Sequence, residues 1–284
     1  MNKTIGIVGL GRVGKEVARG YLAKGYKVMG YDIDNEANSF LESLGGKVGD
    51  SPQKIADSSD ILLILVLNDE QVHEVIESIK KTSNKNLIVI CMSTINRSNL
   101  ENAAASCASI GLRFIDCPFT GGPARVATGR LTLIAAGESS SIDMIDTDLD
   151  VIGNITRAGE KPGLGQAVKH CNQLLVGTTQ AATMEVIALS RRLGLDPKLV
   201  CSVVGSGIAG SDYFRLLAES VLDGKPSPGG LGQMCKDMAI VANTTKEVGL
   251  PANAANAAAK YFEKAAKLGM QDRESADLIE VVEG

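Results

Sequence analysis

The chain has 284 residues, of which 44% are apolar and 22% charged, and its formal net charge at pH 7 is −4. This composition is typical of a globular protein long enough for two domains, and the acidic balance excludes the basic surface expected of a nucleic-acid-binding protein. The longest apolar run, Ile61–Leu67, is too short to span a bilayer. We therefore expect neither a nucleic-acid nor a membrane partner.

The cysteines and histidines indicate a metal-free protein of a reducing compartment. The six cysteines have no C-x-x-C spacing, and the two histidines, His73 and His170, are far apart, so no metal-site pattern is present. The N-terminus lacks the pattern of a signal peptide. We expect the cysteines to be small buried apolar residues in a cytoplasmic protein.

The first half of the chain alternates short apolar segments with helix-like segments. The predicted strands are 4–9, 27–32, 61–67, 87–93, 112–118, 131–137 and 151–159, and the predicted helices between them are 13–24, 35–44, 70–80 and 98–110. This alternation predicts a mostly parallel sheet covered by helices on both faces.

The second half is predicted to be almost entirely helical. After Gly165, the chain up to Arg192 contains no proline and a single glycine, Gly177, and further helical segments follow at 197–204, 213–222, 231–248 and 252–267. The change in pattern predicts an α/β dinucleotide-binding domain over 1–162 and an all-α domain over 163–284. A long helix would join them and open the second domain.

A glycine-rich turn lies between the first predicted strand and the first predicted helix. In the segment GIVGLGRVG, Gly9 permits a tight turn, Gly11 allows a pyrophosphate to approach the backbone, and Gly14 lets the helix pack closely on the strand. The free N–H groups at the helix N-terminus suit the phosphates. The predicted cofactor-binding residues of this turn are Gly9, Leu10, Gly11, Arg12, Val13 and Gly14.

An aspartate at the end of the second predicted strand favours NAD over NADP. The Asp32 carboxylate can accept hydrogen bonds from the adenosine ribose and would repel a 2′-phosphate, and no arginine follows within residues 31–38. Asp34 is nearby, but we expect its side chain to cap the following helix.

A second glycine turn, in the segment DCPFTGGPARVATG, has the features of an anion site. Thr120, Gly121 and Gly122 precede Pro123, and proline is favoured at the first position of a helix. A hydroxyl and two backbone N–H groups at a helix N-terminus suit a small carboxylate. An ordinary glycine turn with a threonine cap is the alternative.

The segment GLGQAVKHCNQ, at the start of the long predicted helix, carries an isolated lysine, Lys169. Asn172 and Gln173 lie at i+3 and i+4, so both can share its helix face. Without further context, Lys169 is either a solvated helix residue or a catalytic group.

These motifs, taken in order, resemble those of the β-hydroxyacid dehydrogenases of the 6-phosphogluconate dehydrogenase superfamily. The family includes 3-hydroxyisobutyrate dehydrogenase and tartronate semialdehyde reductase, and the likeness extends over nearly the whole chain. It is carried by the segments GLGRVGKEVARGYLAKGYKVMGYD, CMSTIN, DCPFTGG, GLGQAVKHCNQ and KDMAIVANTTKEVGLP.

The resemblance implies a Rossmann domain, a helical second domain and NAD(P)-linked interconversion of a 3- or 4-hydroxy acid and its semialdehyde or keto acid. It implies that Lys169 is the general acid/base, assisted by Asn172 or Gln173. It also implies a homodimer or homotetramer built through the helical domain. The remaining implied site residues are Thr120–Gly122, Lys236 and Asp237 for substrate, and Leu67, Asn68, Ser93, Thr94 and Lys236 for cofactor.

The expected chemistry needs a base that takes the hydroxyl proton. An unperturbed lysine is protonated at neutral pH; the positive end of the helix, burial and the nicotinium charge would all favour the neutral amine of Lys169. Two local alternatives stay open: Lys236 as a member of a surface ion pair near Asp237, and Ser93 with Thr94 as a helix-capping pair.

Several residues near the expected substrate depart from the family pattern, so the substrate is left open. Thr120 replaces a serine, Gln173 replaces an asparagine, and Gly229 and Gly230 stand where an aromatic residue is usual. Two other functions share the architecture: an imine reductase, which generally lacks the lysine, and a catalytically silent NAD-binding sensor.

Overall fold

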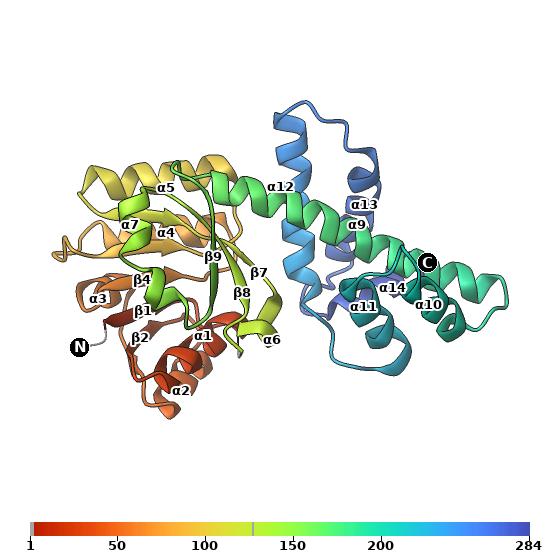
Figure 1. The fold of residues 1–284 in the computed structure, drawn as a ribbon, viewed down its shortest axis with the longest axis horizontal. Helices are drawn as coiled ribbons and strands as arrows, with labels where there is room; N and C mark the ends of the chain where they lie inside the picture. The colour runs from red at the N-terminus through yellow and green to blue at the C-terminus, as the bar shows by residue number, and fades with distance from the viewer. Residues whose placement is uncertain (1–2, 127) are drawn as a thin grey trace. The chain divides into compact units, whose positions relative to one another are not determined.

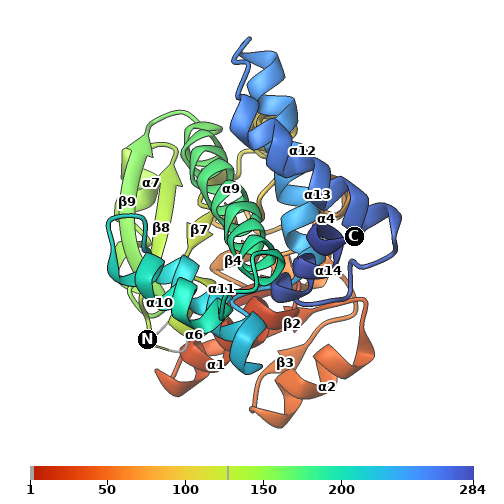
Figure 2. The ribbon, with the colours of Figure 1, turned by 90° about the vertical axis from the view of Figure 1, so that its right-hand side faces the viewer.

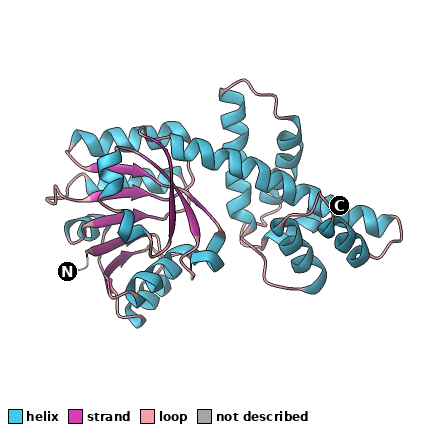
Figure 3. Cartoon of the chain, viewed as in Figure 1, coloured by secondary structure: helices cyan, strands magenta, loops and turns pink. Residues whose placement is uncertain are grey.

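The computed structural model describes residues 3–126 and 128–284. By its internal contacts the chain forms two compact units, Met1–Lys169 and His170–Gly284. Every strand of the described chain lies in the first unit, and the second is built of helices (Figure 3). The predicted fold class, a Rossmann-type α/β domain followed by an all-α domain, is confirmed.

The first unit is organised around one sheet, ordered β3-β2-β1-β4-β5-β6-β8-β7, with β9 paired to β8. The stretch from β3 to β6 is parallel, and its order reverses between β1 and β4, where dinucleotides bind in this type of fold. The strands are β1 (Thr4–Val8), β2 (Lys27–Tyr31), β3 (Lys47–Val48), β4 (Ile61–Ile64), β5 (Ile88–Cys91), β6 (Arg113–Asp116), β7 (Phe119–Thr120), β8 (Leu131–Ala136) and β9 (Gly153–Gly159).

Helices cover both faces of this sheet, as Figure 1 shows. One core packs α1, α2, α6, α7 and α8 against the sheet, and a second core packs α3, α4 and α5 against its other face. The helices are α1 (Arg12–Ala23), α2 (Asn35–Ser43), α3 (Pro52–Asp57), α4 (Asp69–Ile79), α5 (Arg97–Ser109), α6 (Gly122–Val126), α7 (Ser139–Asp143) and α8 (Asp146–Leu149).

All seven predicted strands and the four predicted helices of this half are present, although their ends differ by a few residues. The sequence patterns missed β3 and β7, which have two residues each and are too short to show a period. They also missed α3, α7 and α8, of four to six residues. The sheet is not parallel throughout, because β8 runs antiparallel to both β6 and β7.

The second unit consists of the long helix and those that follow it, with α12 and α13 packed side by side (Figure 2). Its helices are most of α9 (Leu164–Arg192), then α10 (Pro197–Ser206), α11 (Asp212–Asp223), α12 (Leu231–Glu247), α13 (Asn253–Lys267) and α14 (Leu278–Glu283). The division falls inside α9, later than the predicted boundary after residue 162, because the first turn of α9 is bound to the sheet of the first unit.

A glycine in the middle of α9, Gly177, marks a close approach between two helices. A Cβ atom built on Gly177 would lie 2.0 Å from Sδ and 2.8 Å from Cγ of Met238 on α12. Gly177 lies inside a 29-residue helix, where glycine costs about 1 kcal/mol in stability relative to alanine. The close packing of α12 on α9 explains why this position is a glycine, because a larger side chain would meet Met238.

Replacing Gly177 with leucine should therefore destabilise the protein by about 1–3 kcal/mol, the usual cost of overpacking a core. Chemical denaturation measures the change. Met238→Ala in the same chain should restore part of the loss by removing the atoms that the new side chain meets. A double variant no more stable than Gly177→Leu alone would contradict this explanation.

Candidate active site

The glycine turn joins β1 to α1 with the geometry predicted for a dinucleotide fold. Gly9 has a φ of +99°, and its N–H donates to the carbonyl of Tyr31 at 3.0 Å. A Cβ on Gly14 would lie 2.1 Å from the carbonyl oxygen of Gly9, so only glycine fits there. The predicted close packing at Gly14 is confirmed.

Gly11 differs from both neighbouring glycines, because a Cβ built on it would meet nothing within 4 Å. It is the N-cap of α1 and provides no side-chain hydrogen bond to the first turn of that helix. An open approach to a helix N-terminus fits a pyrophosphate. The residues of this turn thus fit the dinucleotide that the sequence predicts.

Asp32 lies directly after β2 and braces this turn. Its Oδ2 accepts a hydrogen bond from the backbone N of Leu10 at 2.6 Å, and its Oδ1 accepts from the backbone N of Asp34 at 2.9 Å. Asp34 caps α2 by accepting from the backbone N of Glu36 at 2.9 Å, as predicted. The carboxylate expected to meet the ribose is therefore held beside the glycine turn by that turn's own backbone.

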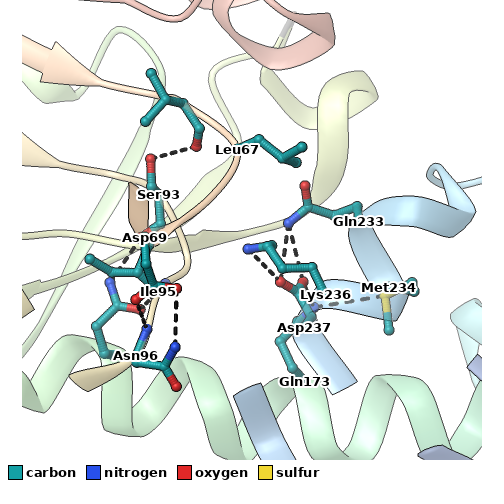
Figure 4. Close-up of polar contacts among 12 residues, drawn as sticks. Leu67, Asp69, Ser93, Ile95, Asn96, Gln173, Gln233, Met234, Lys236 and Asp237 are labelled. Atoms are coloured by element: carbon teal, nitrogen blue, oxygen red, sulfur yellow. Dashed lines mark hydrogen bonds and ion pairs between the residues drawn. The ribbon is translucent and has the colours of Figure 1, made fainter. Parts of the chain in front are cut away.

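The loops after β4 and β5 bring four further predicted cofactor residues, Leu67, Asn68, Ser93 and Thr94, to the same edge of the sheet. The Leu67 side chain is exposed, and Asn68 caps α4 by accepting from the backbone N of Gln71. The Ser93 hydroxyl donates to the carbonyl of Val66 at 2.7 Å (Figure 4), and Thr94 is buried. The N-cap of α5 is Asn96, so the alternative in which Ser93 and Thr94 cap this helix is wrong.

A carboxylate that the sequence analysis did not select joins these two loops. Asp69, the first residue of α4, accepts at Oδ1 from the backbone N of Asn96 at 2.9 Å and at Oδ2 from the Asn96 side-chain amide at 3.0 Å (Figure 4). The bonds fix the position of the Ser93–Thr94 turn relative to the end of β4.

The predicted anion turn has a somewhat different local structure from the one expected. Thr120 belongs to the short strand β7, where it pairs with Thr132 of β8, rather than to a turn. Gly121 and Gly122 have φ values of +129° and +69°, which only glycine adopts readily. Helix α6 starts at Gly122, one residue before the predicted start at Pro123.

The start of α9 is bound to β6 by a buried carboxylate, Asp116, which is 0% exposed. Its Oδ2 accepts from the backbone N of Gly163 at 2.8 Å and of Gln166 at 3.1 Å, and its Oδ1 accepts from Gln166 Nε2 at 3.1 Å. Sequence reasoning missed both side chains. The sequence features that could have indicated them are an acidic residue at the end of a predicted strand, Asp116, and an amide in the first turn of the long predicted helix, Gln166.

Burial raises the pKa of the Asp116 carboxyl to about 6, against the opposing effect of these hydrogen bonds. A carboxyl whose pKa is higher in the folded than in the unfolded chain stabilises the fold while protonated; that stabilisation is lost as the pH rises through about 6. Near pH 7 the ionised form is thus held at a cost in stability, which is typical of functional groups.

Asp116 also corrects one prediction about Lys169. The positive end of α9 was expected to act on the lysine, but the negative charge of Asp116 sits on the first-turn N–H groups and opposes that field. Burial, the second influence expected on Lys169, is present, because this residue is only 8% exposed. The alternative of a solvated helix lysine is therefore wrong.

In the second unit, Gln173 and Asp237 form a buried pair (Figure 4). Gln173 Nε2 donates to Asp237 Oδ2 at 2.6 Å, and Asn172 Nδ2 donates to Gln173 Oε1 at 2.8 Å. Lys236 Nζ lies 2.8 Å from Asp237 Oδ1. The expected ion pair near Lys236 is present, but it is not a surface pair, because the two side chains are 17% and 2% exposed.

The remaining polar residues give no metal site in the described ranges. Across residues 3–126 and 128–284, no three His, Cys, Asp or Glu side chains are grouped closely enough to bind a metal ion. His170 is buried, with Nδ1 2.9 Å from the hydroxyl of Thr244. Four cysteines are buried as expected, whereas Cys171 is exposed and Cys235 half-buried.

A Rossmann sheet with a glycine turn at its reversal point is typical of the class of dinucleotide-binding proteins, to which the nicotinamide-dependent oxidoreductases belong. Residues 4–160 match the NAD-binding domain of 6-phosphogluconate dehydrogenase. Residues 163–282 match the family described as NAD-binding of NADP-dependent 3-hydroxyisobutyrate dehydrogenase. The chain belongs to this 6-phosphogluconate and 3-hydroxyisobutyrate dehydrogenase family, the β-hydroxyacid dehydrogenases.

Similar proteins cover nearly the whole chain. L-threonate dehydrogenase of Escherichia coli K12 is 30% identical over 99% of this chain and 95% of its own length. Human mitochondrial 3-hydroxyisobutyrate dehydrogenase is 29% identical over 87% of this chain and 77% of its own. The crystal structure of 3-hydroxyisobutyrate dehydrogenase from Salmonella typhimurium has a TM-score of 0.89 at 29% identity, covering 98% of this chain and 99% of that one. In the described part of the chain, no helix combines the length and apolar character needed to cross a membrane.

Proposed function

We propose that the protein interconverts a small 3- or 4-hydroxy acid and its semialdehyde or keto acid, with Lys169 as the general acid/base. The observation that carries this proposal is the burial of Lys169 one helical turn after Gln166. Gln166 binds the backbone of the turn that contains Ser93 and Thr94. Lys169 thus lies one helical turn after a residue that is hydrogen-bonded to the predicted cofactor edge of the sheet.

The proposed reaction divides its work among a few groups. A nicotinamide cofactor held by the glycine turn and Asp32 would supply the hydride acceptor for oxidation and the hydride donor for reduction. The neutral amine of Lys169 takes the hydroxyl proton during oxidation, and its ammonium form protonates the developing alkoxide during reduction. Thr120, Gly121 and Gly122 bind the substrate carboxylate, and Asn172 or Gln173 orients the amine or the substrate. Lys236 and Asp237 are further proposed substrate-binding residues, and Lys236 is also a proposed cofactor-binding residue.

We propose NAD as the preferred cofactor because of Asp32. Its carboxylate is held beside the glycine turn by backbone donors, where its charge would disfavour a 2′-phosphate. In the proposed site, Gly9–Gly14 bind the pyrophosphate, and Leu67, Asn68, Ser93 and Thr94 lie along the cofactor.

Steady-state NADH formation at 340 nm tests the proposal. The panel contains 3-hydroxyisobutyrate, D-glycerate, 3-hydroxypropionate, 4-hydroxybutyrate and, because relatives bear its name, L-threonate. We expect turnover of at least one acid, with kcat/KM higher for NAD than for NADP. Tight NAD binding without turnover of any acid or its carbonyl product would favour the sensor instead, and turnover of cyclic imines alone would favour the imine reductase.

A homodimer or homotetramer is also proposed, from an exposed apolar face of the helical unit. Leu175 and Leu189 on α9 are 66% and 58% exposed, and two heptads separate them, so they lie on one stripe of the helix. On α10, Leu199 and Val203 are 62% and 63% exposed. Exposed leucines in such a row are typical of subunit interfaces.

Glutamate at both Leu175 and Leu189 should convert the oligomer into a monomer, because two charges on this stripe would have to be desolvated at the interface. Size-exclusion chromatography with light scattering measures the mass. The matched control is Leu268→Glu, which changes an equally exposed leucine on another helix end and should leave the mass unchanged. An unaltered mass for the double variant would exclude this stripe as the interface.

A further inference from the structure

The hydrogen bonds around the start of α9 form a closed network within the first unit. Gln166 is 0% exposed and uses its whole amide: Nε2 donates to Asp116 Oδ1 at 3.1 Å and to the carbonyl of Ser93 at 2.9 Å, while Oε1 accepts from the backbone N of Ile95 at 3.1 Å. The network therefore joins the end of β6, the turn after β5 and the first turn of α9.

We propose that Asp116, acting through Gln166, is the positioning residue that holds Lys169 against the cofactor turn at Ser93–Ile95. This inference rests on the proposed function, since it assigns a purpose to a network around the proposed base. Asp116 itself reaches no substrate in this account. It caps the first turn of the helix that carries Lys169 and orients the amide that fixes this turn to the sheet.

The donors and acceptors of the network are compatible with only one arrangement of its hydrogen bonds. Ile95 N needs an acceptor and the Ser93 carbonyl needs a donor, so the orientation of the Gln166 amide is determined. Its Nε2 then requires an acceptor at Asp116 Oδ1, while the backbone N–H groups of Gly163 and Gln166 require another at Oδ2. Only an ionised carboxylate supplies acceptors at both atoms.

The closeness of the helix to the carboxylate supports the same assignment. A Cβ on Gly165 would lie 2.9 Å from Asp116 Oδ2 and 2.7 Å from the carbonyl oxygen of Ile134. The glycine thus allows the first turn of α9 to lie directly on β6 and β8. The Asp116 carboxylate is therefore in direct contact with the first turn of the helix that carries Lys169.

The titratable groups described around Asp116 are the thiols of Cys91 on β5 and Cys117 after β6, and burial raises the pKa of both. They are therefore neutral near pH 7, and α9 faces the carboxylate with backbone N–H groups and the Gln166 amide. A proton on Asp116 would place a donor opposite another donor and break the network.

Two substitutions test the proposal in the full-length protein. Asp116→Asn puts an amide donor where an acceptor is needed, and Gln166→Met keeps the side-chain volume but removes the link to Ser93 and Ile95. Each should lower kcat at least tenfold with the best substrate of the panel, while the NADH dissociation constant changes less than threefold. The control is Asp148→Asn, which alters another buried carboxylate, paired with Lys3 and Tyr26, and should leave kcat within twofold of the wild type.

Amide hydrogen exchange of the substrate-free protein supplies a readout that is independent of turnover. The backbone amides of Gly163 and Gln166 should lose protection in Asp116→Asn, and in the wild type they should lose it as the pH falls through about 6. Unchanged protection in Asp116→Asn would overturn the proposal that Asp116 holds the first turn of α9 on β6. Kcat within twofold of the wild type in Gln166→Met overturns the positioning role, and this variant decides the matter if Asp116→Asn does not fold.

The two proposals fail in different ways. If the wild type turns over no acid of the panel, the proposed function fails, and the exchange experiment still tests whether Asp116 holds the first turn of α9 on β6. If the wild type is active and both variants keep its kcat, the positioning role fails and the proposed function stands.

Discussion

Replacing Lys169 with alanine is expected to lower kcat by about a hundredfold or more, because general acid–base catalysis by a positioned group contributes about 10²–10⁴ in rate. The NADH dissociation constant should change little, since the residues proposed to bind the cofactor, the glycine turn and Asp32, lie on other elements. Steady-state rates with the best hydroxy acid, together with NADH fluorescence titration, separate the two effects.

The matched control for this variant is Lys161→Ala, which removes an exposed lysine just before α9 and should keep full activity. A small primary amine such as methylamine should restore part of the rate to Lys169→Ala by taking the place of the lost amine. Full activity in Lys169→Ala would refute the assignment of the base, and an unfolded variant would be recognised by its circular dichroism spectrum.

Substituting alanine at Gly11 and at Gly14 should have opposite consequences. At Gly11 the backbone φ is −65° and the space beside Cα is open, so the fold should lose no more than about 1 kcal/mol, the scale of an N-cap change. The added methyl group would lie where the pyrophosphate is expected to approach, and the NADH dissociation constant should rise at least tenfold.

At Gly14 the added Cβ would lie 2.1 Å from a backbone carbonyl oxygen that no rotamer change can move. We therefore expect a loss of stability of about 3 kcal/mol or more, at or above the upper end of the usual cost of overpacking. Thermal denaturation and NADH titration of both variants measure the contrast. Equal stabilities, or unchanged cofactor affinity in Gly11→Ala, would contradict the roles assigned to the two glycines.

The residues whose function depends on local structure were predictable from the sequence. Gly9 and Gly14 lie in a strand–turn–helix segment, where the required backbone conformation follows from a few neighbouring residues. The same holds for Asp34, since a helix N-cap is decided within three residues. The periodic apolar pattern of the long helix located α9 to within a residue of its observed start.

The network of Asp116 and Gln166 could not be predicted in this way, because its partners are far apart in the chain. Asp116 bonds Gly163 across 47 residues, and Gln166 bonds Ser93 across 73. No period or motif of the sequence links such positions. Only the pairing of β6 with β5 and the packing of α9 on this sheet bring the three segments together.

By itself, then, the sequence determined the order and type of the elements and the place of the dinucleotide turn, because each depends on short-range patterns. It pointed to Lys169 as the candidate base only through the family resemblance, since the local pattern left a solvated lysine equally open. Tertiary structure alone decided the environment of that lysine. The start of α9 presents a carboxylate-capped end rather than a free positive one, and Lys169 is buried rather than solvated. Electrostatic fields and burial depend on which distant residues are brought into contact, and the folded chain makes those contacts.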